Sequence, residues 1–516
     1  MTIAHAPSGR AWWRERWPWF ALVVLSAVLH LWQLGDRSYH HDEAIHAQLS
    51  YELAFEQRYR YNPTFHGPVL YMATAATFLA AGDSDFTARL PAAAAGIALL
   101  WVAWRLRERF GGRAAWWAGL LVTISPLTLF YGRFLRMDIP EMLFASLAFL
   151  ALWRAARGRR AAWVWFGVWA GLAFATKENA YVTAALFGLT LLLAAVGRGA
   201  GRSLRDGLAF ATRHGVDMAG AFGVFVLVTV SLHTVGFSHP GDWFFPGKAI
   251  SYWWQQHTIE RVAGPWWFHL PRLAQYEFLI FGAATAWMIR RGRRAGELER
   301  ALFVFGLLSV GMYIYLGEKV PWLGVHQLWA FLPLAGAQLA RTMGPHGRWW
   351  SRSLAAAGLA ATVAATISAS FILEEITPAQ DRVESLHFVQ TCPELAGFAR
   401  EVAAEDAAAD GPLHVSASGQ AVWPLRWYWR RLDVRWALPR PGDRPAAVVS
   451  DPESATAVRT FIGPGYDELE VPLRAWWLMY QGDPSAGEIA RYALTRVPWT
   501  PVGSADVMVF RRHAAE

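Results

Sequence analysis

The sequence predicts a mainly α-helical, polytopic membrane protein with a small α/β domain at its carboxyl end. The composition is 54% hydrophobic with 30 Trp and a mean hydropathy of +0.20, which is too apolar for an ordinary soluble chain of 516 residues. Apolar stretches long enough to cross about 30 Å of hydrocarbon recur as far as residue 373. Beyond that point the pattern changes to short alternating segments that are typical of strands between helices.

Each apolar stretch of sufficient length is expected to be a membrane-spanning helix, which gives about eleven spans. The run Pro68 to Ala81 is left out, because about fourteen residues suit an interfacial or buried helix better than a span. The expected spans are 18–34, 89–105, 114–131, 139–153, 162–175, 180–197, 216–236, 272–289, 301–316, 322–340 and 353–373.

The charges of the connecting loops predict the orientation. If the run Pro68 to Ala81 does not cross the membrane, 23 arginines fall in short loops on one side of the membrane. The positive-inside rule assigns that side to the cytoplasm. We therefore expect a multi-pass plasma-membrane protein with a cytoplasmic N-terminus and an uncleaved first span. The net charge of +8 is explained by this topology, so nucleic acid is not an expected partner.

This topology divides the chain into two predicted domains. Residues 1–377 form the transmembrane domain, and its first outer loop, 35–88, carries juxtamembrane helices. Residues 378–516 form an extracytoplasmic α/β domain, with strands near Leu413 to Ser416 and Ala446 to Val449 and helices at Ala421 to Arg431 and Ser454 to Ile462. The single cysteine, Cys392, excludes an intramolecular disulfide and a cysteine-based zinc site.

The first outer loop opens with the stretch His40 His41 Asp42 Glu43 Ala44 Ile45 His46, directly after the first span. Charged groups at a membrane boundary are costly and often functional. A carboxylate here can act as a general base or hold a divalent cation. The alternative is that both acids complement the dipole of a surface helix. The two acids and the histidines have the side chains that a divalent cation binds, but their spacing follows no established metal site, so a metal cofactor is left open.

A second polar motif lies between two spans on the same predicted face. Arg133 and Arg136, three residues apart, can point together at an anion, and Asp138 stands just before Pro140 at the start of the next helix. The alternative is a helix-capping aspartate with arginines at the interface.

Two Lys/Glu motifs also face outward. Lys177 with Glu178, and Glu318 with Lys319 and His326, interrupt apolar runs in a chain that has 3 lysines in all. A compact ammonium suits a phosphate oxygen, whereas ion pairing within a helical hairpin is the alternative reading. His66, before Gly67 and Pro68, is a phosphate-binding candidate at the start of a helix, or else a capping or packing residue.

In sequence order these motifs resemble the GT-C superfamily of membrane glycosyltransferases. The resemblance rests on the Asp-Glu pair after the first span, Phe65 His66 Gly67 Pro68 Val69 Leu70 Tyr71, Ala88 Arg89 Leu90 Pro91 and Arg136 Met137 Asp138 Ile139 Pro140. It points to the protein O-mannosyltransferase and aminoarabinose-transferase group. Thr176 Lys177 Glu178 and Gly317 to Trp322 look most like the flippase-activity-associated membrane proteins of that group. The resemblance covers roughly residues 18 to 340.

The resemblance implies an enzyme that takes a sugar from a polyprenyl-phosphate carrier at the outer membrane face. Asp42 would be the base or the carboxylate that orients the acceptor, with Glu43 supporting it and Asp138 as the second acid. The implied donor-phosphate ligands are His66, Arg133, Arg136, Lys177 and Lys319, and the implied supporting residues are His41, His46, Glu178, Glu318 and His326. The sequence departs from related enzymes at His66, where they place a lysine before the proline.

Two other classes of function stay open at this stage. A transporter of lipid-linked oligosaccharide would need polar residues in the middle of its spans or a pair of broken helices, whereas the charge here gathers at one surface. A non-catalytic assembly protein would use the tail to bind partners. The sequence does not identify the sugar, the oligomeric state, or whether the acceptor is a protein, a lipid or a glycan.

Overall fold

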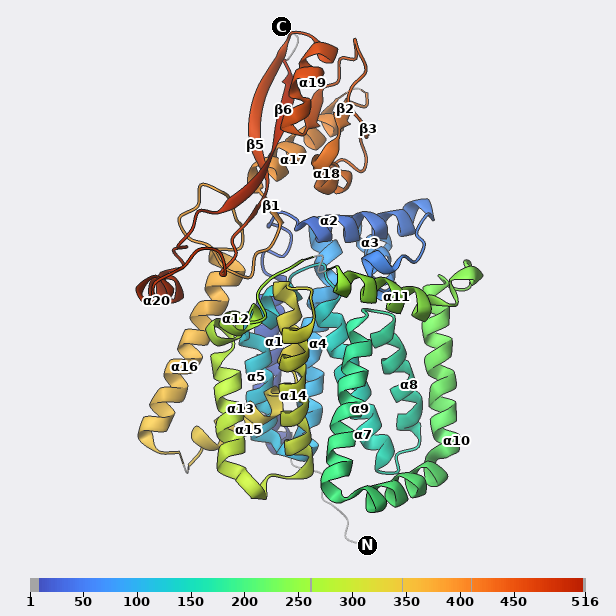
Figure 1. Ribbon diagram of the computed structural model, residues 1–516, viewed down its shortest axis with the longest axis vertical. Helices are drawn as coiled ribbons and strands as arrows, with labels where there is room; N and C mark the ends of the chain where they lie inside the picture. Colours follow the sequence, from blue (N-terminus) through green and yellow to red (C-terminus); the bar gives the residue numbers. More distant parts are fainter. Residues whose placement is uncertain (1–8, 260–261, 346, 410, 514–516) are drawn as a thin grey trace. The chain divides into compact units, whose positions relative to one another are not determined.

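The computed structural model describes residues 9–259, 262–345, 347–409 and 411–513, which form two compact units (Figure 1). Unit 1 comprises residues 1–34, 60–77 and 89–370. Unit 2 comprises residues 35–59, 78–88 and 371–516. The carboxyl-terminal sheet thus shares a compact unit with most of the first outer loop, whereas the predicted boundary at residue 377 assigned that loop to the transmembrane domain.

Unit 1 is built of helices packed side by side, with α7, α8 and α10 in one group and α5, α13 and α15 in another (Figure 1). Its helices are α1 (Gly9–Leu31), α5 (Gly112–Ile124), α6 (Pro126–Gly132), α7 (Asp138–Ala156), α8 (Ala161–Phe174), α9 (Asn179–Arg198), α10 (Ala200–His233), α11 (Phe245–Thr258), α12 (His269–Tyr276), α13 (Phe278–Arg291), α14 (Glu297–Tyr315), α15 (Leu332–Thr342) and α16 (Trp349–Ile367), and helices α3 (Val69–Ala81) and α4 (Asp85–Phe110) belong partly to each unit. Short turns are η2 (Pro63–Phe65), η3 (Pro240–Asp242), η4 (Gly292–Arg294), η5 (Pro321–Gln327) and η6 (Ser368–Ile372).

Every expected span overlaps a helix, but several of those helices are shorter or broken. Within the described part of the chain, six helices are long and apolar enough to cross a membrane, or seven if the pair α5 and α6, bent by 58°, counts as one. The bend lies at Ser125 and Pro126, because proline cannot continue the hydrogen bonding of α5 but suits the first turn of α6. The expected helix over 322–340 begins instead as the 3-10 turn η5 at Pro321. The multi-pass, mainly helical architecture is confirmed, and the number of eleven spans stays a prediction.

Unit 2 contains a six-stranded mixed sheet in the order β1-β5-β6-β4-β2-β3. Strands β2, β3 and β4 are parallel, and β5 and β6 pair antiparallel with their neighbours. The strands are β1 (Gln390–Thr391), β2 (His414–Ala417), β3 (Asp433–Arg435), β4 (Ala447–Ser450), β5 (Tyr466–Trp476) and β6 (Gly503–Arg512). The helical elements are α2 (His41–Tyr51), η1 (Glu52–Glu56), α17 (Pro393–Ala408), η7 (Gly419–Ala421), α18 (Val422–Tyr428), η8 (Pro452–Ser454), α19 (Ala455–Ile462) and α20 (Ala486–Thr495). The predicted α/β character of the tail is confirmed.

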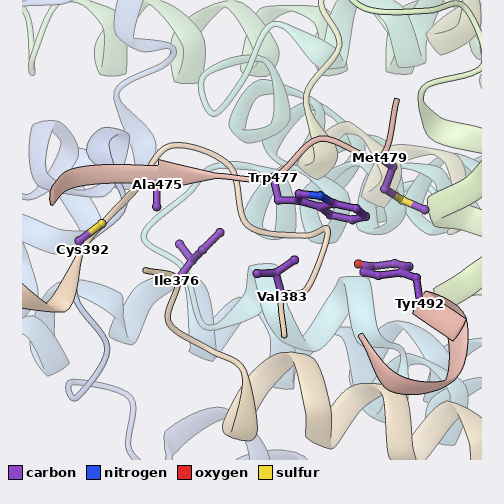
Figure 2. Close-up of a cluster of buried hydrophobic side chains, with 7 residues drawn as sticks. All are labelled: Ile376, Val383, Cys392, Ala475, Trp477, Met479 and Tyr492. Carbon is purple, nitrogen blue, oxygen red and sulfur yellow. The ribbon is translucent and has the colours of Figure 1, made fainter. Parts of the chain in front are cut away.

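A buried apolar cluster joins the end of β5 to α20 and to the segment before β1. Figure 2 shows its side chains, which are Ile376, Val383, Cys392, Ala475, Trp477, Met479 and Tyr492. The rings of Trp477 and Tyr492 lie 4.5 Å apart, and Trp499 packs 4.7 Å from Trp477. Cys392 is a buried packing residue of this core.

The turn before α4 is tied to α18 by charged hydrogen bonds within unit 2. Arg430 donates to the Asp83 carboxylate at 2.7 Å, and Arg431 also pairs with it. Asp85 accepts from the Trp427 indole at 2.8 Å. Burial raises the pKa of Asp83, but Arg430 and Arg431 outweigh it and hold that pKa below its usual value. These bonds explain why 78–88 belongs to the unit that contains the sheet.

We expect Asp83→Asn to loosen α18, because the variant leaves two guanidinium groups without their carboxylate at a cost of about 2 kcal/mol. Since the pKa of Asp83 is lowered in the folded protein, this stabilisation is complete above the ordinary pKa and is lost as the pH falls through the lowered value. Hydrogen exchange of the α18 amides at pH 7 should therefore be faster in the variant. Asp433→Asn, at a carboxylate that is 66% exposed, is the matched control and should leave exchange unchanged. Equal exchange rates in the two variants would contradict the role of Asp83 in holding α18.

Candidate functional site

A buried ionic cluster surrounds Asp138 at the first residue of α7. The Asp138 side chain is fully buried and accepts from the Lys177 ammonium. The Arg136 guanidinium donates to it at 3.3 Å, and His326 contacts it at 3.0 Å. Three candidate residues that the sequence placed in separate loops are thus brought together around one carboxylate.

His326 connects this carboxylate to a second one. Its two ring nitrogens lie 3.0 Å from Asp138 and 3.1 Å from Glu141, one turn further along α7. The ring stacks on Tyr313, whose hydroxyl accepts from Asn179 at 2.6 Å. Two carboxylates on either side favour the protonated imidazole, so the cluster holds several cationic donors in fixed positions.

An apolar groove of about 160 Å³ extends from Glu141 between α7, α8, α9 and α14. Its walls are small and aromatic side chains, namely Ala145, Ala148, Phe149, Leu152, Phe166, Ala170, Ala173, Phe174, Ala180, Thr183, Ala184, Phe187, Phe305 and Trp329. A groove of this kind, with charged groups at one end, suits an amphiphilic ligand with a polar head and a hydrocarbon chain.

Close backbone pairing places His66 beside the Lys177 motif. Gly67 donates to the Thr176 carbonyl at 3.2 Å, and a Cβ at Gly67 would lie 2.2 Å from the Ala175 carbonyl oxygen, so only glycine fits there. This approach brings the His66 ring to 2.7 Å from Glu178. His66 also stacks on Trp253 at 5.0 Å.

Arg133 and Lys319 have contacts that differ from those expected of phosphate ligands. The Arg133 guanidinium donates to the carbonyls of Leu29 at 3.0 Å and Trp32 at 2.6 Å, at the end of α1. The Lys319 ammonium donates to the carbonyls of Tyr313 and Ile314 at the end of α14. Both side chains satisfy carbonyls that a helix terminus leaves without partners. Arg133 and Arg136 therefore contact different groups of the protein, and their assignment as phosphate ligands stays a prediction.

The Asp-Glu pair of the first outer loop lies in unit 2, in the first turn of α2. Glu43 is fully buried, pairs with Arg37 at 3.4 Å and accepts from the His40 backbone N–H at 3.0 Å. His40 in turn accepts from the Asp42 backbone N–H at 3.0 Å, which completes a capping box. Asp42 and His41 are half-buried, and His46 is buried on the same helix. Glu43 thus fixes the start of the helix that carries Asp42.

The part of the chain that the structure describes contains no group of three or more His, Cys, Asp and Glu side chains arranged to hold a metal ion. Glu318 is half-buried in the loop before η5. The sequence reasoning missed Glu141, Tyr313 and Asn179. Glu141 could have been found, because it stands three residues after Asp138 and shares its helix face.

Comparison with known proteins finds a similar family model and similar solved structures. Residues 65–226 match the family model described as dolichyl-phosphate-mannose-protein mannosyltransferase. The structure also resembles solved structures of ArnT from Cupriavidus metallidurans, in the apo state (TM-score 0.64) and bound to undecaprenyl phosphate (TM-score 0.60). Each of these matches is 16% identical and covers 99% of this chain and 100% of that one. An oligosaccharyltransferase from Archaeoglobus fulgidus gives a TM-score of 0.52 at 12% identity, over 87% of this chain and 71% of that one. The chain therefore has the same overall fold as these solved membrane proteins.

One particular relative is a bacterial arabinosyl transferase. Undecaprenyl phosphate-alpha-4-amino-4-deoxy-L-arabinose arabinosyl transferase 1 of Pseudomonas fluorescens is 26% identical over 352 residues, which are 62% of this chain. The match spans 59% of the length of that relative.

We expect Arg133→Met to lower the thermal midpoint of the purified protein without any ligand, because the end of α1 loses its guanidinium cap at a cost of about 2 kcal/mol. Arg159→Met, at an exposed arginine, is the control and should keep the wild-type midpoint. The comparison is made in lipid nanodiscs. An unchanged midpoint in Arg133→Met would contradict this structural role of Arg133.

Proposed function

We propose that this protein is a membrane glycosyltransferase that moves a sugar from a polyprenyl-phosphate donor to an acceptor at the outer membrane face. The observation that carries the proposal is the ionic cluster at one end of an apolar groove in unit 1. A lipid-linked sugar has the complementary chemistry, with a long hydrocarbon chain and an anionic phosphate. The relative that acts on an undecaprenyl-phosphate sugar, as its name states, supports the same donor class.

The donor phosphate is assigned to the cationic groups around Asp138. In the proposed donor complex, Lys177 and Arg136 turn part of their hydrogen bonding from Asp138 to the phosphate oxygens, and the prenyl chain lies along the groove. Asp138 keeps these cations in place before the donor arrives, so little reorganisation is needed when charge develops on the leaving phosphate. His66, beside Glu178, is a further donor-side candidate.

The acceptor side is assigned to Asp42. Its carboxylate takes the proton of the acceptor hydroxyl or amine while the acceptor atom forms a bond to the anomeric carbon. The bond between that carbon and the phosphate oxygen breaks, and polyprenyl phosphate leaves with the electron pair. A single displacement inverts the configuration of the sugar. Glu43 supports the reaction by fixing the first turn of α2.

The membrane orientation is part of the proposal. Arginine-rich loops on the cytoplasmic side and about eleven spans would place the N-terminus inside and both Asp42 and the carboxyl-terminal domain outside. In this orientation the enzyme would take the sugar from a lipid-linked donor whose phosphate lies at the outer surface. It would then need no soluble nucleotide sugar.

Purified protein in nanodiscs, incubated with a panel of polyprenyl-phosphate sugars, tests this function. We expect wild type to release sugar from at least one donor, and Asp42→Asn to lower kcat about 100-fold or more while donor binding is kept, because only the base is lost. Asp467→Asn, at a carboxylate that is 82% exposed, is the control for the same chemical change.

Asp138→Asn should weaken donor binding as well as turnover, because the cations lose the group that positions them. Failure of wild type to turn over every donor in the panel would contradict the proposed function. Wild-type turnover in Asp42→Asn would contradict the assignment of the base.

A further inference from the structure

The parallel strands of unit 2 bring a set of polar groups to the helix that carries Asp42. Gln420 follows β2 and Asp451 follows β4, so both lie at the carboxyl ends of adjacent parallel strands. In the sheet, β3 lies on one side of β2 and β4 lies on the other. The strand order therefore reverses between β3 and β4. The crevice outside such a reversal of strand order is where open α/β sheets bind ligands.

Close packing fixes the loops after β2 and β4 against each other. The Gln420 backbone N–H donates to the Asp451 carboxylate at 3.0 Å. Gly419 has a φ of +65°, and a Cβ there would lie 1.9 Å from an Asp451 carboxylate oxygen. Glycine is therefore needed at this position for both conformation and space.

Arg474 connects the loop after β2 to α2. Its guanidinium donates to the Gln420 side-chain oxygen at 3.2 Å and to Nδ1 of His41 at 3.4 Å. Arg474 follows a bulge in β5, where the register with β6 shifts between Pro472 and Arg474. Bulges redirect side chains and are common beside active sites.

Two acidic residues balance the positive charge of Arg474, namely Asp42 in α2 and Asp451 after β4. Burial lowers the pKa of the Arg474 guanidinium, and Asp42 and Asp451 oppose that change. Burial also lowers the pKa of His41. The negative charge of Asp42 raises that pKa, and the positive charge of Arg474 lowers it. A neutral His41 can accept the hydrogen bond from Arg474. The Nε atom of Arg474 is buried and has no recorded hydrogen-bond partner among the residues that the structure describes.

We propose that Arg474 of the carboxyl-terminal sheet is a positioning residue for Asp42, holding that carboxylate ionised and oriented through direct charge interaction and through His41. This inference rests on the proposed function, in which Asp42 is the base. It makes the tail domain a working part of the catalytic apparatus, since Gln420 accepts a hydrogen bond from the guanidinium and Asp451 holds the Gln420 backbone.

A double-mutant cycle tests the inference in the turnover assay described above. Arg474→Gln should lower kcat about tenfold or more and leave the KM for the donor unchanged, because the residue acts on the acceptor side. In the Asp42→Asn background, Arg474→Gln should have no further effect, because the group on which it acts is absent. In Arg474→Gln the acidic limb of the pH profile of kcat should move to higher pH, since loss of a neighbouring cation disfavours an ionised carboxylate. Arg474→Lys keeps the cation and should restore most of the wild-type kcat and pH profile.

Arg459→Gln is the matched control, because Arg459 also belongs to unit 2 and pairs with Glu468 away from these contacts. It should keep wild-type kcat and pH profile. An equal loss of kcat from Arg474→Gln in the wild-type and Asp42→Asn backgrounds, or an unshifted acidic limb, would overturn the inference. These outcomes presuppose turnover by wild type, so they are distinct from failure of the proposed function, in which wild type itself is inactive.

Discussion

The chemistry of unit 1 depends on the ion pairs that the buried Asp138 carboxylate forms. An isolated ionised carboxylate in an apolar interior is very costly, and three cationic or protonatable partners make it tolerable here. Those partners come from the loop before α7, the loop before α9 and the turn η5. The same electrostatic requirement therefore joins three distant segments of the chain around one carboxylate. Removal of any one partner would leave a charge uncompensated, which explains why the cluster is also a structural constraint.

A second constraint acts in unit 2, where the helix that carries Asp42 is built into the fold of the tail. Tyr39 donates its backbone N–H to the Tyr428 hydroxyl at 3.0 Å and packs 5.5 Å from Trp427. His40 forms an isolated antiparallel bridge with Gln390, the first residue of β1. Glu43 and Arg37 then complete the capping of α2. The position of Asp42 is consequently set by the carboxyl-terminal sheet, although more than 300 residues separate the two in sequence.

The sequence predicted the elements of this structure better than their partners. Long apolar runs are local signals, so the helices and the α/β character of the tail could be read directly. Broken helices were harder, because the expected span over 114–131 was identified from its length and apolar composition, and neither property marks the bend at Ser125 and Pro126. The polar motifs were also visible, since lysine is rare in this chain and charges stand out between apolar segments.

The partners of those motifs could not be predicted, because they arise from contacts between distant segments. Lys177 and His326 meet at Asp138 only in the folded chain, whereas Lys319, in a similar Lys/Glu motif, caps α14. Spacing in sequence does not distinguish an ammonium that meets a carboxylate from one that meets helix carbonyls. Arg474 gave no signal at all, because a lone arginine in an alternating strand is ordinary and its position depends on the bulge in β5.

The most direct test of the central claim is to block the groove without touching the ionic cluster. Ala184 and Ala185 are adjacent and exposed on α9, but only Ala184 is among the groove-lining residues. Binding of undecaprenyl phosphate to Ala184→Phe and Ala185→Phe should be compared in nanodiscs. If the lipid chain occupies the groove, the first variant binds about tenfold more weakly, because the added ring displaces buried methylene groups, and the second binds like wild type. Equal affinity of both variants would contradict the claim that this groove holds the donor lipid.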